Sequence, residues 1–300
     1  MMVKALFKFK YLILVSAILV LLSQCKKDNT TTPPVITDVQ FLGHKGGGNS
    51  TVNPSTVENT IPAIQNGLKT MTGIEVDVQM SLDGTIWVFH DSDIAPTSCN
   101  AIAHKAIILS TDTEIAKFTI CSAKAQDRIY RLSEIVNYWH QASTPFYMSL
   151  HIKLDFPADS MNKPAIGGEA LYLSKFADNL AKIIPSVAVP GKIMLEVYDA
   201  TFCTKIHKLI SGIKVCLIKE VTFPKQINDA IALGYDGVSC IFSEPTLTSD
   251  EVSRAQSNGL IVELWTPDTK QELTTAFGFH PNFIQTNNLN VMSLLNVTVK

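Results

Sequence analysis

Two acidic residues, Glu75 and Asp77, stand one residue apart in an apolar stretch, and His90 follows after a turn sequence. Successive side chains of a strand point to opposite faces, so Glu75 and Asp77 share a face. Asp83-Gly84 is typical of a two-residue hairpin turn, and this register places Asp77 opposite His90, with Cβ atoms roughly 5 Å apart. The sequence therefore predicts two oxygen ligands for a cation beside a group that can transfer a proton.

A second histidine, His44, ends another apolar stretch and is followed by Lys45 and by glycines at positions 46–48. A single histidine is more often a core or surface residue than a catalytic one. Glycines, however, let a ligand approach the backbone closely, and acid–base catalysis needs one group to remove a proton and another to deliver it. We interpret His44 and His90 as that pair. Lys45 either supplies positive charge for a phosphate or is an ordinary ion-pair partner.

His151 and Lys153 share one face of an apolar run at residues 146–153. A lysine inside the fold needs an anion, which is either the acidic pair or a substrate phosphate. The sequence leaves three roles open for His151: a third metal ligand, a residue that orients a ligand, or a hydrogen-bonded core histidine.

Two further residues are expected near the same site. Glu58 precedes Thr60, the predicted N-cap of a helix that starts at Ile61, so Glu58 either helps to cap the helix or faces the site. Trp265 shares a strand face with Glu263 and is expected to form a wall of the substrate pocket.

Eight apolar runs alternate with helical patterns from residue 39 onward. The predicted strands cover residues 39–44, 73–78, 146–153, 192–198, 213–218, 237–241, 260–265 and 282–286. Helical spacing of apolar residues covers residues 61–71, 172–184, 200–210, 224–233, 249–258 and 269–277. This alternation predicts an α/β fold, a (β/α)₈ TIM barrel, with a doubly wound sheet as the alternative.

The catalytic site of such a barrel lies at the C-terminal ends of its strands. His44, Asp77, Lys153 and Trp265 all fall at these ends. Alternating acids are ordinary on a solvated strand face, but unpaired carboxylates inside a barrel cost several kcal/mol each. A cation would offset that cost, which favours a metal site at Glu75 and Asp77.

A long irregular segment follows the second predicted strand. We expect a small insertion at about residues 91–130, leaving the barrel just after His90 and lying over the site, and then a helix at residues 132–139. Cys99 and Cys121 are the best local pair for a disulfide. Cys216 and Cys240 lie in apolar runs and are expected to be buried thiols.

The first 24 residues have the pattern of a signal peptide, with lysines before an apolar run that is short for a membrane span. The segment around Cys25 resembles the lipidation site of bacterial lipoproteins, and residues 25–38 are a polar tether before a domain at residues 39–300. We therefore expect an exported protein, lipid-anchored to the bacterial envelope in the periplasm or at the outer-membrane surface. A plain secretory signal is the alternative. The net charge of −2 argues against nucleic acid as a partner, and the oligomeric state cannot be read from the sequence.

An ordered set of motifs resembles the signature of the glycerophosphodiester phosphodiesterase family, in the superfamily of phospholipase-C-like phosphodiesterase barrels. The stronger motifs are Gly43-His44-Lys45-Gly46, Glu58-Asn59-Thr60, Glu75-Val76-Asp77-Val78-Gln79, Asp83-Gly84 and Val88-Phe89-His90-Asp91. Weaker matches continue through Arg131-Leu132-Ser133-Glu134, His151-Ile152-Lys153, Gly259-Leu260 and Trp265-Thr266.

The resemblance implies metal-dependent hydrolysis of a small phosphodiester to glycerol 3-phosphate and an alcohol. His44 and His90 would be the acid–base pair, and Glu75 and Asp77 would bind Mg²⁺ or Ca²⁺. Lys153 would contact the phosphate or the metal site, and Glu58 matches a family glutamate near the metal.

Three residues depart from the family pattern. Lys45 stands where the family usually has arginine, Asn287 where it often has aspartate, and His151 where it has its third metal carboxylate. An imidazole ligand favours softer metals than Mg²⁺ or Ca²⁺. A phospholipase-D-like or glycosyl-phosphodiester hydrolase of envelope lipids remains open, as does a catalytically weak lipoprotein that binds phosphodiesters or carries a partner.

Overall fold

The computed structural model describes residues 34–99, 103–142, 145–154, 160, 162–184 and 191–300. Residues Val35–Lys300 form one compact unit. The predicted signal peptide, Cys25 and most of the tether lie outside the described residues. Within the described residues, no helix is long and apolar enough to cross a membrane.

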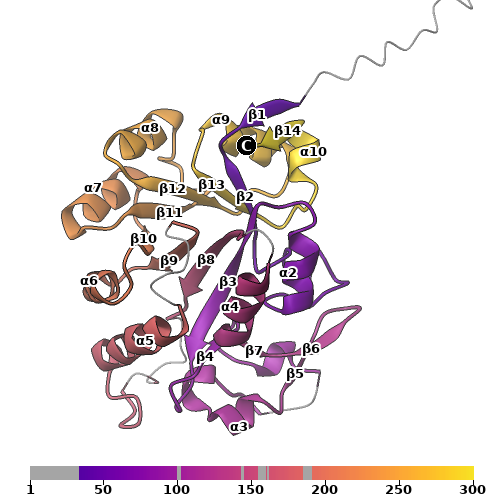
Figure 1. Ribbon diagram of the computed structural model, residues 1–300, viewed down its shortest axis with the longest axis vertical. Coiled ribbons are helices and arrows are strands. Elements are labelled where there is room, and N and C mark those ends of the chain that lie inside the picture. The colour runs from indigo at the N-terminus through magenta and orange to yellow at the C-terminus, as the bar shows by residue number, and fades with distance from the viewer. Residues whose placement is uncertain (1–33, 100–102, 143–144, 155–159, 161, 185–190) are drawn as a thin grey trace, which may run out of the picture. The chain divides into compact units, whose positions relative to one another are not determined.

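Eight parallel strands form a closed barrel (Figure 1). In chain order they are β2 (Gln40–Gly43), β3 (Gly73–Met80), β8 (Tyr147–Ile152), β9 (Ile193–Val197), β10 (Lys214–Ile218), β11 (Gly237–Ile241), β12 (Ile261–Trp265) and β13 (Phe283–Thr286). The barrel closes because β2 pairs with both β13 and β3. The predicted (β/α)₈ barrel is thus confirmed, and the doubly wound alternative is wrong.

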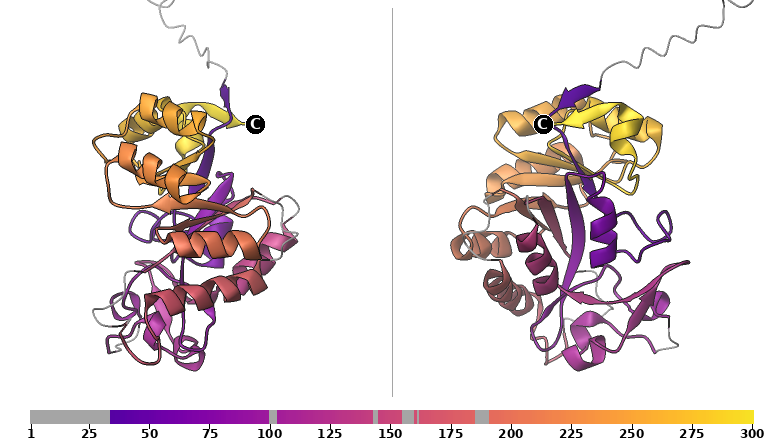
Figure 2. Two further views of the ribbon diagram at one scale, coloured as in Figure 1. Left: turned by 90° about the vertical axis from the view of Figure 1, so that its left-hand side faces the viewer. Right: turned by 45° about the vertical axis from the view of Figure 1, so that its right-hand side comes forward.

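A helix follows each barrel strand and packs on the outside of the barrel (Figure 2). These helices are α2 (Ile61–Gly67), α4 (Leu132–Gln141), α5 (Glu169–Ile183), α6 (Ala200–Leu209), α7 (Phe223–Leu233), α8 (Ser249–Ser257), α9 (Lys270–Gly278) and α10 (Val291–Leu295). As predicted, Thr60 caps α2, accepting a hydrogen bond from the backbone of Ala63. The apolar faces of the helices bury residues against the strands, which gives one continuous core.

The barrel interior changes from apolar to polar along its axis. A small apolar cluster of Leu42, Met194 and Phe283 fills one level. Further along the strands, Ser149, Glu196, Ser239, Glu263 and Gln285 are buried and hydrogen-bonded to one another. The candidate site adjoins this polar layer, because Glu75 pairs with Ser149 and His151 pairs with Glu196.

The insertion between β3 and α4 covers residues 81–131. It contains β4 (Ile86–Val88), η1 (Ala95–Thr97), η2 (Ile107–Leu109), α3 (Asp112–Ile115), β5 (Thr119–Cys121), β6 (Gln126–Arg128) and β7 (Tyr130–Arg131). It has its own apolar cluster around Trp87, Phe89 and Ile120. The predicted disulfide joins Cys99 to Cys121, and Cys216 and Cys240 are buried thiols, as expected.

The predicted register of the β3–β4 hairpin is wrong by one residue. The backbone of Ser81 pairs with Thr85 and Val78 pairs with Val88, so Asp77 lies opposite Phe89 rather than His90. The turn has three residues instead of two, because Gly84 takes the left-handed conformation at φ 84°. An added turn residue shifts every cross-strand pair.

The predicted tether also ends too late, because Val35–Thr37 form β1. This strand pairs in parallel with β14 (Val297–Val299), at the other end of the chain. Val35 and Ile36 are exposed, so backbone hydrogen bonds rather than burial fix β1. A polar, proline-ended segment gives no sign of a partner so distant in sequence.

Candidate functional site

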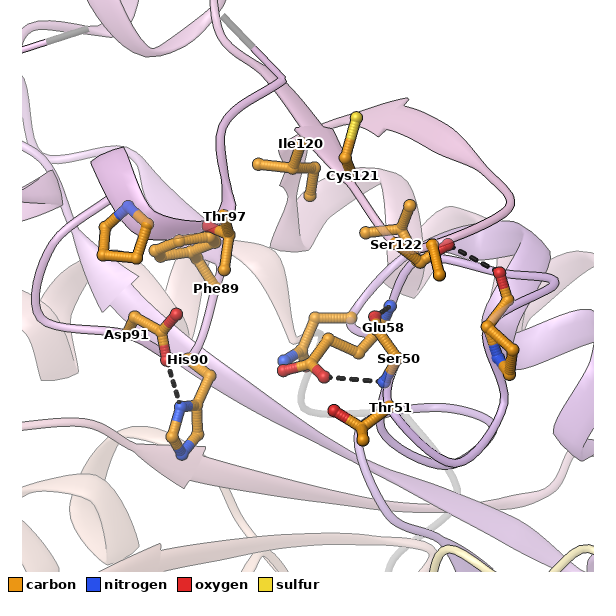
Figure 3. Close-up of a pocket in the computed structure, with 15 residues that line it drawn as sticks. Ser50, Thr51, Glu58, Phe89, His90, Asp91, Thr97, Ile120, Cys121 and Ser122 are labelled. Carbon is orange, nitrogen blue, oxygen red and sulfur yellow. Dashed lines mark hydrogen bonds and ion pairs between the residues drawn. The ribbon is translucent and has the colours of Figure 1, made fainter. Parts of the chain in front are cut away.

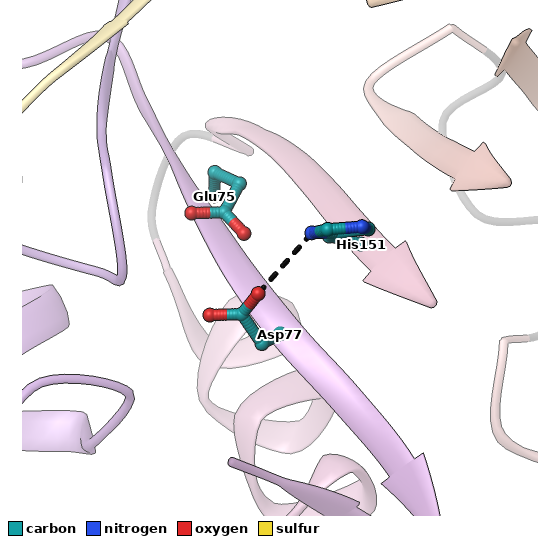
Figure 4. Close-up of side chains that lie close together, drawn as sticks. All are labelled: Glu75, Asp77 and His151. Carbon is teal, nitrogen blue, oxygen red and sulfur yellow. Dashed lines mark ion pairs between the residues drawn. The ribbon is translucent and has the colours of Figure 1, made fainter. Parts of the chain in front are cut away.

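Two carboxylates and an imidazole meet at the mouth of the barrel (Figure 4). Glu75 and Asp77 come from β3 and His151 from β8, and the parallel register places Asp77 beside His151. One ligand atom from each of the three residues lies within 4.8 Å of the others. Nδ1 of His151 is 3.2 Å from Oδ1 of Asp77. Of the three roles left open for His151, its position therefore fits that of a third candidate ligand beside the predicted pair of carboxylates.

The two carboxylates have opposite pKa shifts. Burial, and then the negative charges of Asp77 and Glu196, hold the pKa of Glu75 well above its usual value. Burial would also raise the pKa of Asp77, but the hydrogen bond to His151 and the charge of His90 bring it below its usual value. Two buried acids and one imidazole form an oxygen-rich donor set with excess negative charge. This set fits a divalent cation, which would offset that charge.

Asn59 fixes Asp77 from the loop after β2. Its Nδ2 donates to Oδ2 of Asp77 and its Oδ1 accepts from the Asp77 backbone N–H, both at 3.0 Å. Asn59 has a φ of 61°, a left-handed conformation that asparagine tolerates better than most residues. The sequence motif contained Asn59, but nothing in its local pattern indicated that it would bind Asp77.

Lys45 and Glu58 pair with each other beside the cluster. Nζ of Lys45 is 2.7 Å from Oε1 of Glu58, and the other oxygen of Glu58 accepts from the Ser50 backbone at 2.9 Å. The Lys45 backbone N–H donates to Oε2 of Glu75 at 2.8 Å. Of the two predicted roles of Lys45, the ion pair is therefore present, and Glu58 faces the site instead of capping α2.

His44 lies at the end of β2, next to Glu75. Its Nε2 is 3.9 Å from Oε2 of Glu75, and its Nδ1 is 3.0 Å from Oδ1 of Asn287. Burial lowers the pKa of His44 below its usual value, and the nearby charge of Asp77 only partly opposes this. A neutral imidazole at neutral pH can accept a proton.

His90 follows β4 and is more exposed. Its Nδ1 is 2.7 Å from Oδ1 of Asp91, and this hydrogen bond keeps the pKa of Asp91 below its usual value. The amide of Gln79 fixes this backbone by donating to the carbonyls of Phe89 and Asp91, both at 2.9 Å. The two predicted proton-transfer residues therefore reach one mouth from different strands.

Two cavities are lined by residues that bind Asp77. The first, of about 590 Å³, is lined by His90, Glu58 and Asn59 together with Phe89 and Ile120 (Figure 3). Residues of the insertion line part of this cavity, as expected for a segment lying over the site.

The second cavity, of about 700 Å³, is lined by His151, Lys153, Tyr198 and Trp265. Lys153 and Trp265 are therefore at the mouth, as predicted. Asn59 lines the first cavity and His151 lines the second, and both bind Asp77, so both cavities adjoin the cluster.

The fold and the site together define a class of protein. It is a closed eight-stranded α/β barrel with a candidate metal cluster and two histidines at its mouth. The sequence profile of the glycerophosphoryl diester phosphodiesterase family matches residues 44–291. The chain belongs to this family, and its members are phosphodiesterases, which places it among the phosphoric diester hydrolases.

Solved structures support the same fold. A Silicibacter pomeroyi protein, provisionally classed as a glycerophosphoryl diester phosphodiesterase, has a TM-score of 0.73 at 15% identity over 89% of this chain and 96% of its own. An Oleispira antarctica phosphodiesterase in complex with the product sn-glycerol-3-phosphate has a TM-score of 0.67 at 16% identity, over 86% and 96%. A Parabacteroides distasonis glycerophosphodiester phosphodiesterase has a TM-score of 0.67 at 14% identity, over 86% and 97%. No match was found among the curated proteins.

Proposed function

We propose that the barrel mouth hydrolyses glycerophosphodiesters to glycerol 3-phosphate and an alcohol, with a bound divalent cation. The observation that carries this proposal is the cluster of Glu75, Asp77 and His151 between two histidines from different strands. The family membership supports the reaction, and the Oleispira antarctica relative binds glycerol 3-phosphate as its product. No described feature favours the phospholipase-D-like, glycosyl-phosphodiester or purely binding alternatives.

Glu75, Asp77 and His151 would hold the cation, which would stabilise negative charge on the phosphodiester when bound. Asn59 orients Asp77, and the backbone of Lys45 orients Glu75. Lys153 and Trp265 line the adjacent cavity, where Lys153 is suited to bind a phosphate oxygen.

The two histidines divide the proton transfers. His44 has the environment of a base, because burial favours its neutral form, and it removes a proton from the attacking water or substrate hydroxyl. His90 delivers a proton to the leaving alcohol. The Asp91 carboxylate accepts from Nδ1 of His90, so it orients the ring and stabilises positive charge on it.

Export and lipid anchoring at Cys25 are part of the proposal. An envelope location, in the periplasm or at the outer-membrane surface, would place the barrel near head groups released from membrane lipids. The support is the lysine-rich, apolar N-terminal segment with Cys25 after it.

The test is to incubate the purified protein with glycerophosphocholine and Mg²⁺, Ca²⁺, Mn²⁺ or Zn²⁺, and to follow glycerol 3-phosphate enzymatically. We expect turnover that a chelator abolishes and added metal restores. Turnover that survives complete removal of metal would contradict the cation's role. No turnover with any of these ions would overturn the proposed reaction.

A further inference from the structure

A buried amide and a carboxylate lie behind His44, and the reaction above does not use them. Oδ1 of Asn287 is 3.0 Å from Nδ1 of His44, and Nδ2 of Asn287 is 2.7 Å from Oδ2 of Asp268. Asn287 directly follows β13 and is only 3% exposed, whereas Asp268 lies in the loop between β12 and α9. The three side chains form a chain of hydrogen bonds that ends at the candidate base.

The orientation of the Asn287 amide follows from its partners. The Asp268 carboxylate only accepts hydrogen bonds, so the NH₂ group of Asn287 must face it. At the other end, the backbone N–H of Asn49 donates to Oδ1 of Asn287 at 2.8 Å, which only an oxygen can accept. A flipped amide would set two acceptors against each other on one side and two donors on the other.

The surroundings hold this pair rigidly. The other oxygen of Asp268 accepts from the Thr286 hydroxyl at 2.9 Å and from the Asn287 backbone at 2.8 Å. The Asn53 amide donates to the Asn287 carbonyl at 2.9 Å. A Cβ at Gly48 would lie 2.0 Å from the Asn53 amide nitrogen, so glycine is required for the loop to pass there.

This arrangement decides which nitrogen of His44 carries the proton. A neutral imidazole has one N–H, and the hydrogen bond to an amide oxygen requires it on Nδ1. The lone pair is then on Nε2, the nitrogen that lies 3.9 Å from Glu75 at the barrel mouth.

We propose that Asn287 and Asp268 are positioning residues that hold His44 in the Nδ1–H tautomer, with Nε2 as the proton acceptor. The catalytic part rests on the proposed function, but the tautomer is a property of the folded protein and can be measured without substrate. Asn287 accepts from Nδ1 of His44 in the same way as Asp91 accepts from Nδ1 of His90. The group next to the His44 ring is a neutral amide, however, and the negative charge lies one residue further away, on Asp268.

The first test reads the tautomer directly. The protein has seven histidines, so a ¹⁵N-histidine sample gives a resolvable two-bond ¹H–¹⁵N spectrum, and the His44→Gln variant assigns the His44 signals. At about pH 8, above the ordinary imidazole pKa, we expect a protonated Nδ1 and a bare Nε2. The Nε2–H tautomer, which predominates for free histidine in water, or an even mixture of the two, would overturn the proposal.

The second test exchanges the two positioning groups. Asn287→Leu removes the acceptor, and Asp268→Asn removes the group that orients the amide. In the double variant Asn287→Asp/Asp268→Asn, the new carboxylate accepts from His44 and Asn49. The new amide would donate to that carboxylate, and its oxygen would still accept from the Thr286 hydroxyl and from the backbone N–H of residue 287.

We expect Asn287→Leu to lower kcat by about 10²-fold, at the lower end of what a positioned proton-transfer group contributes, with little change in KM. The double variant should regain the Nδ1–H tautomer and most of kcat, whereas Asp268→Asn alone should show mixed tautomers and a partial loss. Equal losses in the single and double variants, with melting curves like that of the wild type, would contradict a positioning role. A wild-type protein that hydrolyses the diester but shows Nε2–H would overturn this inference and leave the proposed function intact.

Discussion

An imidazole nitrogen stands among the carboxylate oxygens of the candidate metal cluster. His151 lies 3.2 Å from Asp77 in a set that otherwise offers only oxygen. Oxygen ligands suit Mg²⁺ and Ca²⁺, whereas imidazole suits transition metals and zinc. One side chain would therefore set in large part which ion this candidate site prefers.

The variant His151→Glu tests this dependence. It creates a ligand set of three carboxylates, so we expect affinity for Mg²⁺ or Ca²⁺ to rise and affinity for Zn²⁺ to fall, each by at least about tenfold. Isothermal titration calorimetry on metal-free protein measures both. His140→Glu is the matched control, because it makes the same change at an exposed position of α4. Identical metal affinities in the two variants would show that His151 is not a ligand.

Asp112 links the elements that form the insertion. The carboxylate accepts from the Ser81 hydroxyl at 2.7 Å, the Thr85 hydroxyl at 2.5 Å and Nε1 of Trp87 at 3.0 Å, so it joins α3 to the β3–β4 hairpin. Burial alone would raise the pKa of Asp112, but these hydrogen bonds bring it below its usual value. The insertion also lines the first cavity, so its rigidity bears on the site.

Replacement of Asp112 by alanine should destabilise the protein by about 2–3 kcal/mol, because buried donors lose a charged acceptor. Urea unfolding measures this. Asp38→Ala is the control, since Asp38 forms an exposed ion pair with Lys300 and its loss should change stability by less than about 1 kcal/mol.

The same carboxylate predicts a pH dependence. A lowered pKa in the folded state means that the stabilisation is present above the unfolded pKa and is lost as pH falls through the folded value. The wild type should therefore lose more stability than Asp112→Asn on acidification below about pH 4. Parallel pH profiles of the two proteins would rule out this contribution.

The sequence predicts a structural element well when the contacts that form the element are between residues close together in the chain. The alternation of apolar runs was enough to predict the eight barrel strands. The positions of the strand ends were enough to predict that four residues lie at one mouth, namely His44, Asp77, Lys153 and Trp265. The predicted hairpin register was wrong because one more turn residue, Leu82, is not visible in the alternation.

Other contacts depend on residues far apart in the chain. Asn59 reaches Asp77 only because the loop after β2 adopts one particular conformation, and Asn287 reaches His44 only after the barrel has closed. The strand β1 likewise needs β14 as its partner. Periodicity carries no information about such pairs, because their geometry is fixed by the complete fold.

At the scale of the whole molecule, the barrel gives the site two cavities and two candidate proton-transfer groups. Closure between β2 and β13 brings His44 beside Asn287, and the insertion after β3 carries His90. The proposed lipid anchor at Cys25 adds a separate property, because it would hold the barrel at the bacterial envelope.

Lipid anchoring predicts the distribution of the protein in cell fractions. In a bacterial host, Cys25→Ala should move the protein from the membrane fraction to the soluble fraction, because the acylated residue is absent. Immunoblots of separated fractions measure this, with Thr31→Ala in the tether as control. Unchanged partitioning of Cys25→Ala would contradict the anchor.

The most direct test of the central claim is the rate at which glycerol 3-phosphate appears from glycerophosphocholine in wild type, His44→Gln and His90→Gln. We predict metal-supported release by the wild type and losses of at least about 10²-fold in each variant. His90→Gln should recover with a p-nitrophenyl diester, whose leaving group needs no proton, and His44→Gln should not. Wild-type protein that releases no glycerol 3-phosphate, or variants that match it, would contradict the account.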